Sequence, residues 1–463
     1  MSVPSTSQKT DIRTVKSPVS YPLWHPYVPL NGLEARVTIL VEGKGCKVKD
    51  NHGKEYIDAS GGLWNTHCGL GNAEISRAIS DQLAKLSYGT LFAWRGNKPA
   101  LDLARELAAL APGPLEWVYL TGSGSESVEL AVKIARLYYR LRGKDKQGDI
   151  VYLDESYHGT FFGSMSVSGL ARQTEVGPLL PGVSSISTPN IERCPQDMLY
   201  TDFALSCARE LEDKAIEGGV AAFIVEPIIA SAGVVIPPVE YFRRVQEICR
   251  QFDILLILDE VATGFGRTGR WFAAEHYDLH PDILLVSKGL TSGYLPLGAV
   301  LFSEGIGSLF MKHGAGLCHG STNNGHPVCC AAALETIRVI RRDRLVERSA
   351  EMGHYFRMRL EELTSLPTVS GVRSMGLMLG LVLTQDDGSP ATLRQRFHVF
   401  RSLQEEGILA YLAGNSLVFC PAFVIAREEI DIIVQRLLRV LSSISFRGGI
   451  VETPSNPNPS TAR

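Results

Sequence analysis

Lys288 is the residue of this chain whose position most clearly suggests chemistry. It follows the aliphatic run Ile283–Val286, which is typical of a buried strand, and the segment 289–298 after it is rich in small residues. A lysine at the end of a buried strand is costly as a charge, so it tends to lose its proton or to gain a partner. The neutral amine is a nucleophile that can form a Schiff base. An isolated lysine of this kind is more often an ordinary surface residue, and its interest depends on the motifs around it.

A second candidate is the segment Thr121–Glu126, which follows an expected strand and opens an expected helix at 125–141. Backbone N–H groups at a helix N-terminus bind anions, and the small residues Gly124 and Ser125 would let a phosphate approach closely. A serine N-cap followed by a glutamate is also an ordinary helix start, so the motif alone leaves both interpretations open. Because Ser127 stands where a dinucleotide fingerprint has its third glycine, a nicotinamide dehydrogenase is disfavoured.

Further candidates follow other strand-like runs. Asp259 and Glu226 each come directly after an aliphatic run, and carboxylates at strand ends of an open α/β sheet lie where ligands bind. Tyr157 and His158 follow a third run, where an aromatic ring could stack on a flat cofactor. Asp259 could instead be a helix cap and Tyr157 a surface aromatic. Together with Lys288 and the helix start, these residues fit a pyridoxal phosphate pocket.

The elements that must position these residues alternate between strands and helices in the middle of the chain. This alternation favours a mostly parallel sheet with helices on both faces. The segment 35–57 alternates with period two and indicates a hairpin or small meander, and the pattern after about 345 indicates a smaller α+β lobe. The expected strands are 118–120, 150–153, 221–225, 254–258, 283–286, 369–383 and 417–419, and the expected helices are 73–86, 99–110, 125–141, 239–251, 329–341, 345–363, 394–406 and 428–444.

These patterns divide the chain into segments. We expect a mobile N-terminal segment at 1–20 and a large cofactor-binding domain at 73–344. A smaller domain would combine 21–72 with 345–446. The last residues, 447–463, carry Pro, Asn, Ser and Thr without periodicity, which predicts a disordered tail.

Composition restricts the class of protein further. The net charge of −3 gives no electrostatic reason to expect binding to nucleic acid or to an anionic membrane. No apolar run is long enough to cross a bilayer, and the polar start lacks the apolar core of a secretory signal. The 9 cysteines are scattered without a CxxC pair, which predicts a reduced, cytoplasmic protein. The 11 histidines show no metal-ligand spacing, so we expect no metal site.

Ordered motifs give the chain a resemblance to a known family. They are Gly62–Asn65, Ser123–Glu126, Tyr157–Gly159, Val225–Pro227, Leu258–Val261, Gly264–Gly269 and Ser287–Leu290. From about Trp24 to Arg439 the chain resembles the class III (ω-) aminotransferases, which are fold-type I enzymes that use pyridoxal 5'-phosphate. The resemblance implies an α/β fold with a large, mostly parallel, seven-stranded sheet domain and a smaller α+β domain built from both chain ends.

The resemblance also implies roles for residues around the cofactor ring. Lys288 would be the catalytic residue and would carry the cofactor as a Schiff base. Asp259 would keep the pyridine nitrogen protonated, and Val261 and Tyr157 would lie against the two ring faces. An incoming amine would displace Lys288, which would then act as general base and acid. Since a second carbonyl substrate reverses the steps, the kinetics would be ping-pong.

Other motif residues would complete the cofactor site. Gly124 and Ser125 would cradle the phosphate, His158 belongs to the same cofactor-binding motif as Tyr157, and Glu226 would lie near the ring. Thr322 resembles the threonine that reaches the phosphate of the neighbouring subunit. This resemblance implies a homodimer with the active site at the subunit interface.

The substrate pocket departs from the family pattern. Trp64 would form one wall, and Tyr411 stands where many members place an arginine ahead of a turn such as Gly414-Asn415. An arginine grips a carboxylate with two hydrogen bonds, which a tyrosine cannot do. Either Arg95, Arg172 or another cation therefore binds the substrate carboxylate, or the substrates differ from the usual ones.

We therefore expect an enzyme that moves an amino group from an amine or ω-amino compound to a carbonyl acceptor. The alternative is a pyridoxal phosphate enzyme of the same fold with a non-transaminating reaction in specialised metabolism. Such a reaction could be that of a lyase, an epimerase, a decarboxylase or a carbon–carbon bond-forming enzyme, since fold does not fix function. A non-enzymatic binding protein would be expected to lack Lys288 or Asp259, and both are present.

Overall fold

The computed structural model describes residues 23–27, 37–170, 176–447 and 450–452. The expected mobile segment at 1–20 lies outside these residues, as does Arg172. Among the described helices, none combines the length and the apolar character that crossing a bilayer requires.

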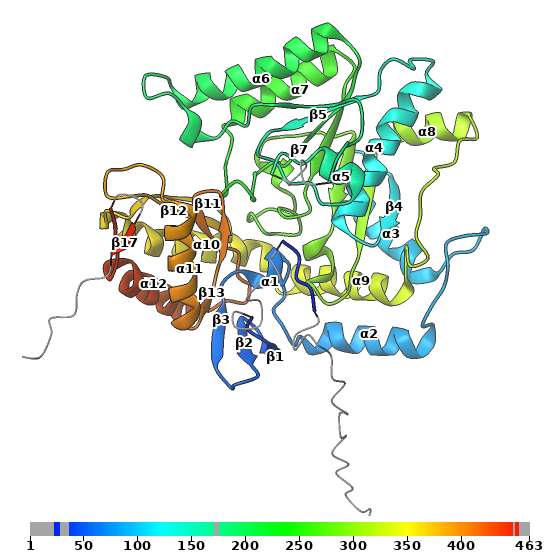
Figure 1. Cartoon of the computed structure of the whole chain (residues 1–463). Helices are drawn as coiled ribbons and strands as arrows, with labels where there is room; N and C mark the ends of the chain where they lie inside the picture. The colour runs from blue at the N-terminus through cyan, green and yellow to red at the C-terminus, as the bar shows by residue number, and fades with distance from the viewer. Residues whose placement is uncertain (1–22, 28–36, 171–175, 448–449, 453–463) are drawn as a thin grey trace, which may run out of the picture.

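A seven-stranded sheet forms the centre of the larger domain, with strand order β4-β10-β9-β8-β7-β5-β6 (Figure 1). The strands from β9 to β6 run parallel, and β10 runs antiparallel to both of its neighbours. The predicted large, mostly parallel sheet is confirmed, although β6 and β10 were not predicted. The strands are β4 (Trp117–Thr121), β5 (Asp149–Leu153), β6 (Val183–Ile186), β7 (Val220–Val225), β8 (Leu255–Asp259), β9 (Ile283–Val286) and β10 (Gly298–Phe302).

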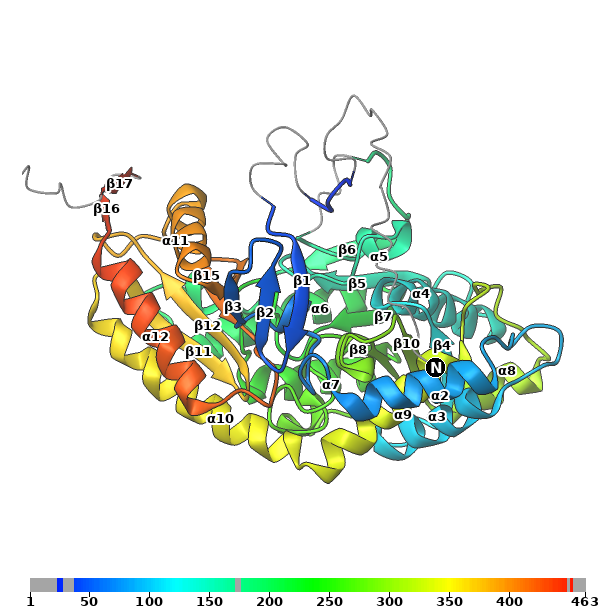
Figure 2. The ribbon, with the colours of Figure 1, turned by 90° about the horizontal axis from the view of Figure 1, so that it is seen from below.

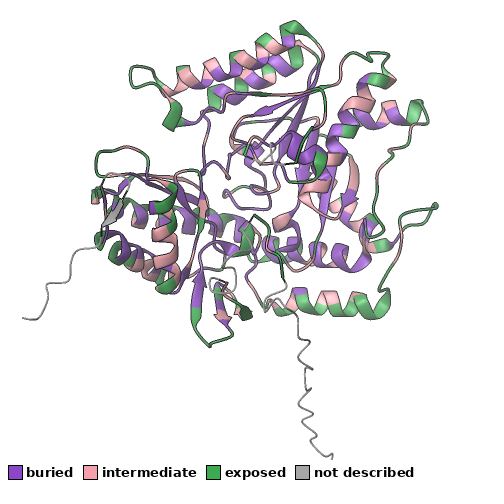
Figure 3. Cartoon of the chain, viewed as in Figure 1, coloured by how far each residue is buried: buried purple, intermediate pink, exposed green. Residues whose placement is uncertain are grey.

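Helices cover both faces of this sheet, because alternate residues of each strand point to opposite sides. Ile257 packs in a buried cluster with α4 (Gly124–Leu141), whereas Leu256 packs in another cluster with α7 (Val239–Gln251). Figure 3 shows the buried strands between helices with exposed outer faces. The other helices of this domain are α2 (Ala73–Lys85), α3 (Lys98–Leu110), α5 (Phe162–Ser166), α6 (Tyr200–Glu217), α8 (Glu304–Lys312) and α9 (Pro327–Arg342), with 3₁₀ turns η2 (Ile191–Arg193), η3 (Ala273–His276) and η4 (Lys288–Thr291).

The smaller domain joins the two ends of the chain. The meander β1 (Leu40–Lys44), β2 (Lys47–Asp50) and β3 (Glu55–Asp58) is extended by β13 (Ile408–Leu409), which pairs in parallel with β3. This pairing confirms an α+β domain built from both ends, and the boundaries at 72 and 344 stay a prediction.

Apart from α1, the rest of the smaller domain comes from the C-terminal part of the chain. The helices α9 and α10 lie along one side of the molecule and connect the two domains (Figure 2). The remaining elements are α1 (Gly61–Trp64), α10 (Leu345–Glu361), η5 (Glu362–Ser365), β11 (Val369–Met375), β12 (Met378–Leu383), α11 (Leu393–Glu405), β14 (Tyr411–Ala413), β15 (Ser416–Phe419) and α12 (Arg427–Ser442).

The C-terminal segment 447–463 differs from the predicted disordered tail at its start. Ile450–Glu452 form β17, which pairs antiparallel with β16 (Ser445–Arg447). Phe446 is fully buried in the core, and its carbonyl accepts a hydrogen bond from the N–H of Asp386. This anchor and the β-branched residues of β17 favour a strand where composition alone predicted none. Residues 453–463 lie outside the described part.

Candidate active site

The carboxyl ends of parallel strands meet at one edge of the sheet, and the candidate residues gather there. Asp259 is the last residue of β8 and lies opposite Leu285 of the neighbouring strand β9. Lys288 follows the end of β9 as the first residue of η4. Glu226 follows β7, which pairs with β8 on its other side. The sheet therefore brings a lysine and two carboxylates to neighbouring positions.

A cavity of about 180 Å³ opens at this edge. All of the predicted site residues except Thr322 and Tyr411 line it. Five other residues line the cavity although no role was predicted for them from the sequence. Four of these five lie within a predicted motif or next to one. A second cavity, of about 400 Å³, shares Ser123, Ser287 and Lys288 with the first, so Lys288 is one of three residues that border both. The five lining residues without a predicted role are Leu63, Gly159, Ser231, Ala262 and Ser287.

Asp259 is a buried carboxylate held from two sides. The Nδ1 atom of His158 lies 2.7 Å from Asp259 Oδ2, and the N–H of Val261 donates to Oδ1 over 3.0 Å. His158 is itself fixed, because its backbone N–H donates to Ser168 Oγ at 2.8 Å. The Nε2 atom of the buried His158 ring has no hydrogen-bond partner among the described residues. These two contacts therefore fix the orientation of the Asp259 carboxylate at the wall of the cavity.

Glu226 forms a second buried carboxyl group behind the cavity. Its Oε1 accepts the N–H of Tyr157 at 2.9 Å, and its Oε2 accepts the N–H of Ala230 at 3.2 Å. Burial raises the pKa of Glu226 to about 7, while His158 acts to lower it and Asp259 to raise it. This group therefore exchanges its proton near neutral pH and orients the backbone of Tyr157.

Lys288 has a strained backbone and a depressed pKa. Its φ is +37°, a left-handed value that is uncommon for a residue with a side chain. Its Nζ lies 4.9 Å from the centre of the Trp64 ring. Burial lowers the pKa of the Lys288 ammonium, and the carboxylates of Asp259 and Glu226 act in the opposite direction. The effect of burial is larger than that of the carboxylates, so Lys288 loses its proton more easily than an exposed lysine does.

The start of α4 forms a cup for an anion. Ser123 is the N-cap, and its Oγ accepts the N–H of Glu126 at 3.2 Å. The next residues, Gly124 and Ser125, line the cavity at the positive end of the helix. Gly159 closes the cup with a φ of +119°, and a Cβ added to it would lie 2.3 Å from Ser125 Oγ. The missing side chain leaves the space that Ser125 occupies, so Gly159 lets the Ser125 hydroxyl keep its place at the edge of the cup.

Trp64 and Tyr411 form an aromatic wall. Their ring centres are 5.4 Å apart with planes at 78°, an edge-to-face contact. Asp58 holds the turn before Trp64, because its Oδ2 accepts the N–H of Gly62 at 2.6 Å. Tyr411 is 39% exposed, so it stands at the outer end of the wall.

Tyr27 was not singled out by sequence reasoning, although it contacts this site. Burial raises the pKa of Tyr157, and a hydrogen bond with Tyr27 adds to the effect. Tyr27 also raises the pKa of Tyr411, after the larger effect of burial. The three tyrosines come from distant parts of the chain, and no local motif signals their meeting.

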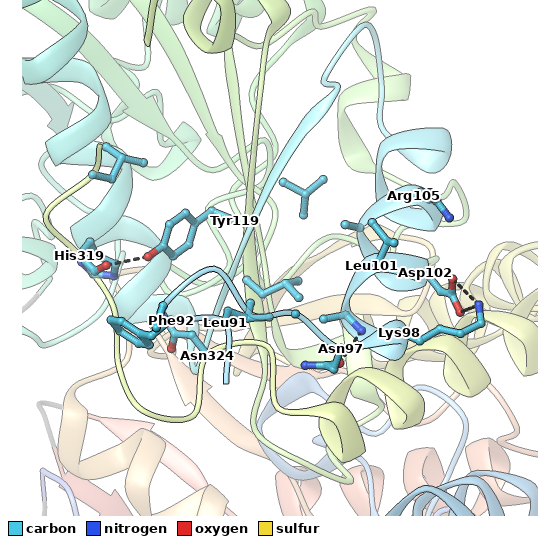
Figure 4. A pocket seen from close by; sticks show the side chains of 17 residues that line it. Leu91, Phe92, Asn97, Lys98, Leu101, Asp102, Arg105, Tyr119, His319 and Asn324 are labelled. Carbon is cyan, nitrogen blue, oxygen red and sulfur yellow. Dashed lines mark hydrogen bonds and ion pairs between the residues drawn. The ribbon is translucent and has the colours of Figure 1, made fainter. Parts of the chain in front are cut away.

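Thr322 does not line the cavity of its own chain. Its carbonyl accepts the hydroxyl of Tyr88 at 2.9 Å. Its loop borders a separate groove of about 960 Å³, which His319 and Asn324 line together with apolar residues and with the polar side chains of Asn97, Lys98, Asp102 and Arg105 (Figure 4). Arg95, one of the suggested carboxylate ligands, is exposed and does not line the cavity at Lys288.

These observations fit pyridoxal phosphate as a bound group. The cup at α4 suits a phosphate, Asp259 suits a protonated ring nitrogen, and Lys288 suits covalent attachment to an aldehyde. Gly124 also faces the place where the ring would lie, since a Cβ on it would come within 3.0 Å of Val261 Cγ1. The hydrogen-bonding groups around the cavity therefore suit pyridoxal phosphate, which is the cofactor that the sequence motifs predicted.

Comparison with known proteins gives the same result. Residues 31–441 match the family Aminotransferase class-III. The chain is 34% identical over 426 residues to the putrescine–pyruvate aminotransferase of Pseudomonas aeruginosa, covering 89% of this chain and 91% of that one. It is 33% identical over 435 residues to the β-alanine–pyruvate aminotransferase of the same organism, covering 91% and 96%.

Solved structures of transaminases share the fold. An (S)-enantioselective ω-transaminase from Thermomicrobium roseum aligns with a TM-score of 0.87 at 35% identity, covering 90% of this chain and 95% of that chain. The ω-transaminase of Pseudomonas jessenii in complex with PMP aligns with a TM-score of 0.86 at 34% identity, covering 91% and 96%. The chain belongs to the class III aminotransferase family. It is a pyridoxal phosphate-dependent transferase that catalyses transamination.

Proposed function

We propose that Lys288 is the catalytic residue of this aminotransferase and that the cavity beside it binds the cofactor. The observation that carries this proposal is the position of Lys288, which lines the same cavity as the Asp259 carboxylate and the cup at α4. When bound, pyridoxal phosphate supplies an aldehyde that condenses with amines and a ring that withdraws electrons from the substrate carbon. The chain itself supplies attachment, orientation and proton transfer.

The residues around the cavity divide these tasks. Lys288 Nζ holds the cofactor and then moves a proton, which its depressed pKa favours. Asp259, oriented by His158, would accept a hydrogen bond from the ring nitrogen. Val261 and Tyr157 would hold the ring between them. Because each half of the reaction uses the same lysine, two substrates react in turn, which gives ping-pong kinetics.

The phosphate cup and the buried carboxyl group have supporting tasks. Gly124 and Ser125 offer N–H and hydroxyl donors to the phosphate. Glu226 accepts hydrogen bonds from the backbone of Tyr157 and of Ala230 and so fixes the loop that carries the stacking ring. These groups bind and orient without taking part in proton transfer at the substrate.

The substrates we propose are a primary amine or ω-amino compound as donor and a small carbonyl compound as acceptor. The relatives named for putrescine with pyruvate and for β-alanine with pyruvate support this class. The wall of Trp64 and Tyr411 suits the non-reacting end of such a substrate, because it offers ring faces and a hydroxyl group.

We also propose that the active unit is a cytoplasmic homodimer. Phe92, which lines the groove of Figure 4, is 52% exposed, and Trp94, two residues further along the chain, is 106% exposed. Such a patch is typical of a subunit interface. Thr322 belongs to the loop whose residues His319 and Asn324 line the groove, it does not line the cavity of its own chain, and it would serve the site of the second copy. The cysteines among the described residues are all free, which supports a reducing compartment.

A panel of amines tests the proposed function. Each amine is mixed with cofactor-loaded protein, and the loss of the aldehyde absorbance is followed while mass spectrometry identifies the carbonyl product. We expect at least one primary amine or ω-amino acid to give both signals, and pyruvate or another carbonyl acceptor to restore the absorbance. A protein that gives neither signal with any amine would contradict the proposal.

A further inference from the structure

Arg267 is a fully buried cation within the motif Gly264–Gly269, and the proposed function gives it no task. Its Nη1 donates to two backbone carbonyls, that of Leu377 at 2.8 Å and that of Pro421 at 2.7 Å. Its partners among the described residues include no carboxylate, and its Nε has no hydrogen-bond partner among them. A buried charge is costly unless it is paired, so an arginine held by neutral groups needs an explanation beyond packing.

The guanidinium of Arg267 keeps its charge at neutral pH. Burial lowers the pKa of Arg267 to about 10, and the thiols of Cys420 and Cys46 act in the opposite direction. Burial raises the pKa of Cys420 to about 11 and raises that of Cys46 as well, so both thiols are neutral at neutral pH. A positive charge that neither thiol cancels is therefore built into the protein interior.

His67 lies between this charge and the turn that carries Lys288. Its Nδ1 is 3.4 Å from Nη2 of Arg267, and its Nε2 is 3.2 Å from the carbonyl oxygen of Gly264. Burial lowers the pKa of His67, and the charge of Arg267 lowers it further, which keeps the ring neutral. Nε2 then donates to Gly264, and Nδ1 accepts from the guanidinium.

The ring of His67 packs directly on the backbone after Lys288. A Cβ added to Gly289 would lie 2.3 Å from His67 Nε2, so the ring occupies the space that a larger residue would need. The same ring contacts that of Phe423, with centres 4.6 Å apart. Gly289 follows Lys288, whose φ of +37° must be held by its surroundings. The His67 ring is therefore one of the contacts that hold this strained turn.

Charged and titratable groups face Lys288 from four parts of the chain. The carboxylates of Asp259 and Glu226 favour its ammonium form, and the thiol of Cys420 acts in the same direction. Burial is the larger cause of the lowered pKa of Lys288, and the charge of Arg267 adds to it. The imidazole beside the turn is neutral and adds no charge. Among these groups of the described chain, Arg267 is the cation that opposes the two carboxylates.

We propose that Arg267 and His67 form a buried pair that positions Lys288 for catalysis. The inference rests on the proposed role of Lys288. The ring of His67 holds the turn, and the guanidinium next to the ring, fixed by two carbonyls, disfavours a second positive charge on Nζ of the lysine. Neither residue of the pair lines the cavity at Lys288, so both act through the lysine and do not touch the substrate.

The first test compares two arginines that hold backbone carbonyls in the same region. Like Arg267, Arg348 donates to two carbonyls, those of Phe423 and Ile425, each at 2.8 Å. The absorbance of the full-length protein loaded with pyridoxal 5'-phosphate is titrated with pH, which follows the proton on Nζ of Lys288. Arg267→Met should raise the midpoint by about one pH unit, because the loss of a nearby positive charge favours the protonated form. Arg348→Met is the matched control and should stay within about 0.3 pH units of the wild type, since its charge does not act on Lys288.

The second test uses His67 and stays informative if Arg267→Met does not fold. His67→Ala removes the ring that holds the turn and should lower kcat by about tenfold or more, with the KM of the amine unchanged, because the positioning of Lys288 is lost. His67→Phe keeps a ring against Gly289 and should retain kcat within about threefold of the wild type.

The outcomes separate the pair from the proposed function. A midpoint of Arg267→Met equal to that of the wild type or of Arg348→Met would overturn the pair, and so would a His67→Ala protein as fast as His67→Phe. Both results leave the proposed role of Lys288 intact. A loaded wild-type protein in which borohydride does not trap the cofactor on Lys288 would instead contradict that role.

Discussion

The Nδ1 atom of His158 lies 2.7 Å from Oδ2 of Asp259, and both side chains are buried. The contact joins the loop after β5 to the end of β8, so it fixes two neighbouring edges of the cavity at once. Hydrogen bonds to a buried ionised group are among the stronger ones in proteins. The direction of the Asp259 carboxylate therefore depends on His158.

His158→Phe should reduce kcat by roughly 10- to 100-fold, the loss expected when a buried carboxylate loses one hydrogen bond. A planar aromatic ring is kept at this position, so the fold should persist. Steady-state kinetics on the loaded enzyme measure this effect, with circular dichroism as the check on folding. A variant that is as active as the wild type would show that Asp259 needs no orientation by His158.

Glu226 should make the cofactor-free protein less stable as pH rises. Burial raises its pKa to about 7 from an ordinary 4.5, so between these values the folded state keeps a proton that the unfolded chain has lost. The stability that comes from the protonated form is complete below 4.5 and is lost as pH rises through 7. By linkage, the wild type should lose roughly 3 kcal/mol relative to Glu226→Gln over this range. Urea unfolding of both proteins at pH 4.5 and pH 8 tests the difference, and parallel pH profiles would contradict it.

Gly159→Ala should weaken cofactor binding by about tenfold or more, since the new Cβ would press on Ser125 Oγ from 2.3 Å in a left-handed backbone. The control is Gly148→Ala, where an added Cβ meets no heavy atom within 4 Å. Absorbance titration of the cofactor-free proteins gives both affinities. Equal affinities for the two variants would mean that the phosphate does not depend on the position of Ser125.

Tyr411→Arg should lower the KM of pyruvate as acceptor by about tenfold, because a guanidinium binds a carboxylate through two hydrogen bonds. Tyr411→Phe keeps a ring against Trp64 and should leave this KM nearly unchanged. Acceptor kinetics with a fixed amine donor compare the three proteins. If arginine brings no improvement, position 411 does not face the acceptor carboxylate.

The sequence predicted the parts of the molecule that depend on local pattern. The aliphatic runs before Glu226, Asp259 and Lys288 became parallel strands, and parallel pairing placed the residues after them at one edge. The helix α6 was missed because the side chains it buries are mainly small, such as Ala204 and Cys207, which give a weak apolar stripe. The strand β10 was missed because glycine and proline residues precede it.

Contacts between distant segments could not be predicted from local pattern. Tyr27 meets Tyr157 at the candidate site although no spacing relates them. The sequence likewise predicted Glu126 only as part of a helix start, whereas its carboxylate also holds Asn324. Such contacts depend on how the elements pack, which a single strand or helix does not encode.

The most direct test of the account is to locate the lysine that holds the cofactor. The loaded protein is reduced with borohydride, digested and analysed by mass spectrometry, and the same is done with Lys288→Ala. The account predicts a pyridoxyl group on the peptide that contains Lys288, no labelled peptide in the variant, and a loss of turnover of at least about 1,000-fold. A label on another lysine, together with full activity of Lys288→Ala, would contradict it.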